Sequence, residues 1–137
     1  MAPDSHYALA AVLATADMQR LYSGLSLLVS AAVDGEACAA LATFRSLELI
    51  VDPGLGRLAA KPEATPGLAW QGRERFARSL AELRDTALAL DSLAVYACSA
   101  SVETMPLSEA DLDARFDGVM STPRFLRETA GARLLFV

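Results

Sequence analysis

The clearest indication of the fold class is Leu93-Ala-Val-Tyr-Ala-Cys98, which is followed by Ser99-Ala-Ser101. Six apolar residues in a row are typical of a strand covered on both faces, as in a parallel sheet between two helical layers. The preceding segment, 73–90, has apolar residues three and four positions apart, which predicts a helix. A helix that leads into a buried strand indicates an α/β fold.

The same alternation extends over the rest of the chain. Its order is β-α-β-α-loop-α-β-α-α-β, which predicts a single domain over 1–137. We expect a three-layer α/β/α fold with a mainly parallel central sheet of four to five strands. The further strands are expected at 7–15, 36–44 and 132–137, and the further helices at 18–33, 46–51, 123–130 and from 108 onward.

Two polar residues and one Pro/Gly-rich segment mark the boundaries of these elements. Asp17 and Ser108 can cap the helices that follow them, with Asp111 at the reciprocal position of the second cap. The segment 52–67 is expected to be a loop, because Pro and Gly residues interrupt any longer element in it. Loops of this length in compact domains are commonly functional or mobile. We therefore interpret 52–67 as a candidate cover for a site at the sheet.

The composition excludes several classes of protein. The chain of 137 residues carries 12 Lys and Arg against 17 Asp and Glu, a net charge of −5, and an acidic surface repels nucleic-acid phosphates and anionic membranes. No apolar stretch reaches the length of a membrane span, and the N-terminal segment lacks the basic residues of a signal peptide. With one His, two Cys and no CxxC pair, neither a metal nor a cofactor is expected. We expect a cytoplasmic protein that binds neither nucleic acid nor membrane.

Cys98 is the candidate catalytic residue. In parallel sheets, reactive groups gather at the carboxyl ends of strands, and Cys98 ends one. The N–H groups of the following turn would favour its nucleophilic thiolate form; the alternative is a buried, inert packing residue. Cys38 is expected toward the amino end or middle of a buried strand, without a disulfide to Cys98. The candidate pocket around Cys98 consists of Ser99, Ser101, Glu103, Phe44 and Trp70.

Several short segments carry a family resemblance. The stretch 93–102 is followed by Met105-Pro-Leu-Ser-Glu-Ala-Asp-Leu112, by Arg124-Phe-Leu-Arg-Glu-Thr-Ala130 and by the final Leu134-Leu-Phe-Val137. Together with Thr43-Phe-Arg-Ser-Leu47, these segments resemble the DsrE/DsrF-like family, which includes the TusD-type sulfur-relay proteins. In that family a glycine is common at the position of Ser46. The resemblance implies an α/β/α fold, homo-oligomers or hetero-oligomers (trimers or hexamers), and a persulfide carried on one cysteine. Cys98 matches that cysteine, and the implied partner is a sulfur donor or acceptor protein.

Two functions of different classes follow from these observations. The first is a persulfide carrier, in which the Cys98 thiolate accepts sulfur from a donor and presents it to an acceptor without a metal or cofactor. The alternative is a non-catalytic oligomeric or small-ligand-binding module of the same fold, in which Cys98 only packs. A carrier requires an accessible thiol, so the exposure of Cys98 discriminates between the two hypotheses.

Overall fold

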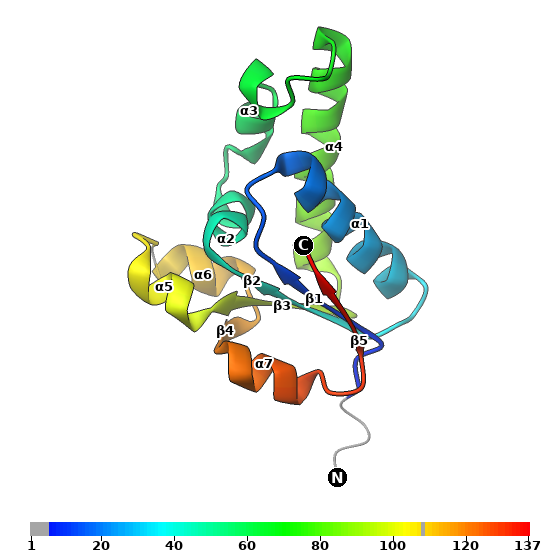
Figure 1. The fold of residues 1–137 in the computed structure, drawn as a ribbon, viewed down its shortest axis with the longest axis vertical. Helices are drawn as coiled ribbons and strands as arrows, with labels where there is room; N and C mark the ends of the chain where they lie inside the picture. The colour runs from blue at the N-terminus through cyan, green and yellow to red at the C-terminus, as the bar shows by residue number, and fades with distance from the viewer. Residues whose placement is uncertain (1–5, 108) are drawn as a thin grey trace.

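The computed structural model describes residues 6–107 and 109–137. Five parallel strands form one sheet between helical layers, which confirms the predicted three-layer α/β/α fold (Figure 1). The spatial order of the strands is β4-β3-β2-β1-β5. The strands are β1 (Leu9–Leu13), β2 (Cys38–Ala42), β3 (Leu93–Cys98), β4 (Gly118–Met120) and β5 (Arg133–Phe136).

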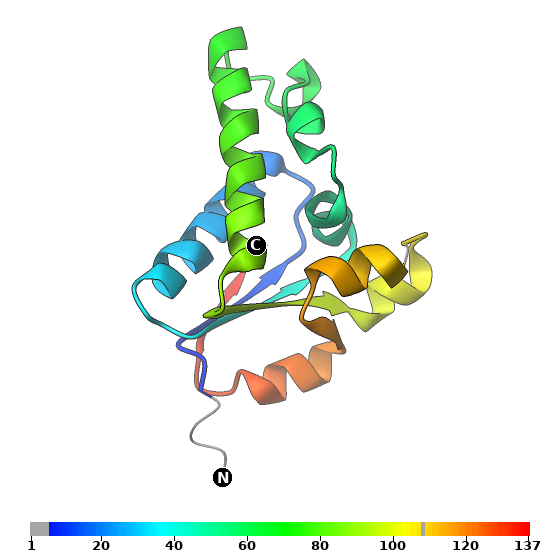
Figure 2. The same ribbon diagram turned by 180° about the vertical axis from the view of Figure 1, so that it is seen from behind.

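The order of the strands determines which helix covers which face. The connections from β1 to β4 step across the sheet in one direction, whereas the connection from β4 to β5 returns past three strands. Because crossovers between parallel strands are right-handed, the returning connection must pass on the opposite face. Accordingly, α7 (Thr122–Glu128) lies on one face, here called the lower face, while α1 (Met18–Val33) and α4 (Trp70–Ala89) cover the upper face (Figures 1 and 2).

The remaining helices lie on the upper face or at the carboxyl end of the sheet. α2 (Phe44–Val51) and α6 (Glu109–Arg115) contribute apolar side chains to the upper core, and α3 (Leu55–Ala59) packs on α4. α5 (Ser99–Thr104) directly follows β3. In the part of the chain that the structure describes, no helix is long and apolar enough to cross a membrane.

Successive strand residues point to opposite faces, so the sheet separates two apolar clusters. The larger, upper cluster includes the fully buried Leu13, Leu21, Leu28, Leu47 and Leu80. The smaller, lower cluster lies between the sheet and α7. It consists of Ala10, Ala39, Leu41, Cys98, Met120 and Phe125, with Tyr7, Val12, Tyr96 and Ala132 packed against it.

Most predicted elements are confirmed, but α5 was not predicted and α4 begins three residues before the predicted 73. Helix 18–33 begins as expected, with an Asp17 carboxylate oxygen accepting the N–H groups of Gln19 and Arg20 at 2.9 and 3.1 Å. The expected loop at 52–67 is wrong in part, because it contains α3 and a 3₁₀ turn, Pro62–Ala64. The strand β4 was not predicted, and α2 begins two residues before the predicted 46. The proposed cap at Ser108 lies outside the described residues.

Arg84 of α4 fastens that helix to the end of α2. Its side chain is buried, and Nη1 donates to the carbonyl oxygens of Ile50 and Asp52, both at 2.8 Å. Nε donates to the Asp85 carboxylate at 2.7 Å. Carbonyl groups at the C-terminal end of a helix lack intrahelical donors, and the guanidinium supplies them here.

Candidate functional site

Cys98 occupies the predicted place in the topology. It is the last residue of β3 and precedes α5, so it lies at the carboxyl edge of the sheet. Cys38 begins β2 and aligns with Leu93 at the opposite end of β3. Both cysteines are free. The expected separation of the two cysteines is therefore confirmed.

The Cys98 side chain is buried beneath the sheet. It is only 4% exposed and belongs to the lower cluster, whose other members are apolar. α7 contributes Phe125, which is fully buried, to the same cluster. The thiol is thus enclosed by the sheet and α7, whereas the carrier hypothesis requires a thiol that another molecule can reach.

The other cysteine is buried even more completely. Cys38 has no exposed surface, and its Sγ lies 3.6 Å from the Glu36 carbonyl oxygen, to which it donates. Burial raises the pKa of the Cys38 thiol, the Glu36 carboxylate raises it further, and Arg133 acts in the opposite direction. These observations fit the predicted inert role of Cys38.

The residues of the candidate pocket do not all come together. The Phe44 N–H donates to Ser101 Oγ at 2.8 Å, which joins the start of α2 to α5, and Ser99 lies next to Cys98 in the chain. Glu103 is exposed on α5. Trp70 is the first residue of α4 and is 61% exposed, at the end of the helix that extends past the sheet beside α3 (Figure 1). The inclusion of Trp70 in a pocket around Cys98 is therefore wrong.

Buried hydroxyl groups hold the carboxyl ends of the strands together. Thr43 Oγ1 donates to the Leu13 carbonyl oxygen at 3.0 Å, and Ser46 Oγ donates to the Thr15 carbonyl oxygen at 2.7 Å. Ser101 Oγ serves the same purpose as an acceptor. These three side chains are buried, and their hydroxyl groups form hydrogen bonds within the protein. They are therefore not free to bind a substrate.

Phe44 has the one strained backbone conformation at this edge. Its φ of +41° makes it the only non-glycine residue with positive φ in 6–107 and 109–137. A bulky residue in this region costs about 1–2 kcal/mol, so the surrounding structure must impose it. The hydrogen bond to Ser101 is one such constraint, and the Phe44 side chain remains 48% exposed.

The segment 52–67 does not cover Cys98. α3 packs against α4, and Leu55, Ala59 and Thr65 have no exposed surface. This segment therefore lies on the upper side of the molecule (Figures 1 and 2). Cys98, in contrast, belongs to the lower cluster. The proposed covering role is wrong, because the apolar residues between the Pro and Gly positions pack into the upper cluster.

Two open hollows lie along α4. The first, of ≈ 420 Å³, runs between α3 and α4, and the second, of ≈ 380 Å³, runs between α1 and α4 and includes the tilted ring pair Tyr22–Phe76. Neither contains Cys98. Their lining residues are Gly56, Arg57, Ala60, Glu74, Ala77 and Arg78 in the first, and Gln19, Tyr22, Leu68, Gly72, Arg75, Phe76 and Ser79 in the second.

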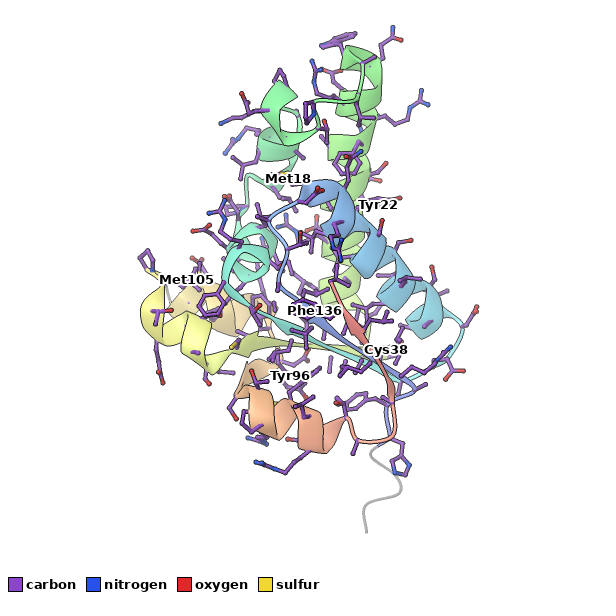
Figure 3. The ribbon with its side chains drawn as sticks, in the orientation of Figure 1. Met18, Tyr22, Cys38, Tyr96, Met105 and Phe136 are labelled. Atoms are coloured by element: carbon purple, nitrogen blue, oxygen red, sulfur yellow. The ribbon has the colours of Figure 1, made fainter. Side chains whose placement is uncertain are left out.

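A tyrosine pair on the lower face was missed by the sequence analysis. Tyr96 of β3 points toward the side of α7 (Figure 3). Its side chain is hydrogen-bonded to that of Tyr7. Burial, followed by the hydrogen bond with Tyr7 and by nearby negative charge from Asp117 and Glu128, raises the pKa of Tyr96 to about 12. The signal in the sequence was the position of Tyr96, two residues before Cys98 and therefore on the same face.

The raised pKa of Tyr96 predicts a loss of stability at alkaline pH. Between its ordinary pKa of 10.0 and about 12, Tyr96 is ionised in the unfolded chain but protonated in the folded chain. The unfolded chain then binds fewer protons, so the free energy of unfolding is expected to fall as the pH rises through this range. Urea denaturation at several pH values would measure the fall, and Tyr96→Phe should make it smaller. An equal fall in both proteins would contradict the assignment.

Apolar side chains are exposed on β5 and α7. Leu134 and Phe136 of β5 are 52% and 73% exposed, and Leu126 of α7 is 47% exposed. Leu134 and Phe136 align with Ala10 and Val12, which point to the lower face. We call Leu134 and Phe136 the β5 patch. Clustered apolar exposure of this kind marks interaction surfaces.

The described residues provide no group of three or more His, Cys, Asp or Glu side chains that could hold a metal ion. In comparisons with known proteins, the chain matches no family model and no curated protein. The functional argument therefore depends on the geometry of Cys98 and of the apolar surface.

Proposed function

We propose that this chain is a non-catalytic module that self-associates through its lower side, with Cys98 as a packing residue. The observation that carries the proposal is the contrast between the thiol, which is 4% exposed, and the β5 patch, which is more than half exposed. A reactive group must be reachable, whereas an interface must present apolar surface. The resemblance to the DsrE/DsrF-like family, whose members form oligomers, supports the same proposal.

The proposal predicts slow reaction of both thiols. In the native chain we expect iodoacetamide to modify Cys98 about 100-fold more slowly than in urea, because reaction requires local opening of the lower cluster. The measurement uses Cys38→Ser, in which Cys98 is the only thiol, and follows the mass increase with time. The matched control is Cys98→Ser, which leaves the fully buried Cys38. Native Cys98 that reacts at the rate seen in urea would contradict the packing role.

A second candidate function is the persulfide carrier. The observation that favours it is the position of Cys98 at the carboxyl end of β3, directly before α5. In that reaction the Cys98 thiolate attacks the outer sulfur of a donor persulfide. A new S–S bond forms on Cys98, the S–S bond of the donor breaks, and the donor leaves as a thiolate. The reaction requires α7 to move away from the thiol, and rapid alkylation of native Cys98 would favour it.

The two cysteines also bear on location. The chain has two free cysteines and no disulfide. Such usage is typical of chains in reducing compartments, and we therefore propose the cytoplasm as the location of the module.

A further inference from the structure

In the part of the chain that the structure describes, β5 leaves one of its edges unpaired. It is the terminal strand of the sheet and pairs with β1 on one side only. The N–H groups of Arg133 and Val137 donate to the Ala8 and Val12 carbonyl oxygens at 3.1 and 2.9 Å. Because alternate residues of a strand direct their backbone groups to opposite edges, those of Leu134 and Phe136 face away from β1.

Within 6–107 and 109–137, no other helix or strand is drawn over this edge (Figure 1). In Figure 1, β5 is the strand nearest the viewer, with α1 above it and α7 below it. Figure 3 labels Phe136 on this strand. Proteins commonly protect edge strands by keeping them short or with charges, prolines or bulges. The strand Arg133-Leu-Leu-Phe136 is short, but it contains no proline and a single charge, at its first residue.

We propose that β5 pairs antiparallel with β5 of a second copy across a two-fold axis at Leu135, which extends the two sheets into one. This inference rests on the proposed self-association and names the surface responsible for it. The occupant is a second copy because the edge is self-complementary in this arrangement: each partner presents the same outward backbone groups.

The hydrogen-bonding pattern selects the register. With the axis at Leu135, Leu134 of one copy lies opposite Phe136 of the other, and each such pair exchanges two hydrogen bonds. An axis at Leu134 would place Phe136 opposite Ala132, whose N–H already donates to the Thr129 carbonyl oxygen at 3.0 Å. An axis at Phe136 would leave Leu134 opposite no residue of β5. The register at Leu135 therefore uses all the outward groups of Leu134 and Phe136.

Side chains and charges agree with this register. Leu134 and Phe136 extend from the same face of the sheet, so each exposed leucine would contact an exposed phenylalanine across the strands. The two Arg133 residues would lie four strand positions apart along the pair, about 14 Å at the rise of a strand. That distance exceeds the Debye length of about 8–10 Å, so their repulsion is screened at physiological salt.

The size of the contact sets the expected affinity. A stable interface buries about 800 Å² per partner, which is roughly a tenth of the 7506 Å² of accessible surface of this chain. One short strand with two exposed side chains falls below this area, so association is concentration-dependent. Sedimentation should cover about 1 μM to 1 mM of the full chain.

The test combines the mass of the assembly with a cross-link that reports the register. In the background Cys38→Ser and Cys98→Ser, Leu135→Cys is expected to form a covalent dimer under mild oxidation, because the two Cα atoms face each other across the axis. The matched control Leu134→Cys should not form this dimer, since the Cα atoms of position 134 in the two chains would lie more than about 7 Å apart. Phe136→Lys should weaken association about tenfold, while Leu126→Lys, an exposed position on α7, should leave it unchanged.

The outcomes separate the two proposals. A chain that stays monomeric at every concentration overturns both self-association and the β5 contact. Two other results overturn only the β5 contact. One is an assembly that is dissociated by Leu126→Lys but not by Phe136→Lys. The other is an isolated trimer, because a trimer contains no two-fold axis. A cross-link as efficient at 134 as at 135 would also overturn the register. Circular dichroism of each variant establishes that it is folded.

Discussion

Replacing Arg84 with Met is expected to lower the free energy of unfolding by about 3 kcal/mol. Methionine keeps most of the length and apolar volume of the side chain but has no N–H group. The carbonyl oxygens of Ile50 and Asp52 would then lose their donor, in a site where Arg84 itself is only 4% exposed. Urea denaturation followed by circular dichroism would measure the loss.

The matched control is Arg78→Met on the same helix. Arg78 is exposed, so its replacement should change the free energy of unfolding by less than about 0.5 kcal/mol. The loss of stability in Arg84→Lys should lie between those of Arg84→Met and Arg78→Met, because one ammonium group cannot reproduce the geometry of the guanidinium. Equal stability of Arg84→Met and the natural chain would show that the two carbonyl groups find water instead.

Replacing Phe125 with Ala is expected to have a still larger effect, a loss of about 4 kcal/mol. Phe125 is fully buried, and it is the aromatic side chain by which α7 fills the lower cluster. Truncation would leave a cavity between α7 and the sheet, beside Cys98. We expect the same variant to increase the alkylation rate of Cys98 while Cys38, which lies in the upper cluster, stays protected. Denaturation and mass spectrometry measure the two effects.

The control for Phe125 is its neighbour in the chain. Leu126→Ala removes an apolar side chain that is 47% exposed, and its effect on stability should remain within about 0.5 kcal/mol. If Phe125→Ala destabilised the chain without exposing Cys98, then α7 would not be what encloses the thiol. The packing role of Cys98 would need another explanation.

The fold could be predicted largely because its signals are local. The six apolar residues of 93–98 specify a buried strand, and Asp17 marks the start of the helix at 18. The place of Cys98 at the carboxyl edge followed directly from the strand. The short strand β4 escaped prediction because three residues, the first of them Gly118 with φ +150°, carry no periodicity.

The state of the site depended on contacts that no local pattern encodes. Whether Cys98 is open or closed is decided by α7, which reaches the lower face only because β5 must return past three strands to pair with β1. The role of Arg84 depends on carbonyl groups more than thirty residues away. The positive φ of Phe44 likewise depends on Ser101 of another element. Sequence periodicity predicts such elements but not their long-range partners.

The pairing of β1 with β5 joins the first strand of the chain to the last. During synthesis, β1 leaves the ribosome long before residues 133–136, so the outer edge of β1 stays open until β5 has emerged. The backbone groups of Ala8, Ala10 and Val12 that later receive β5 are then available to any other extended peptide. The sheet is thus completed by one four-residue segment, and until that segment pairs, the open edge of β1 is exposed to mispairing.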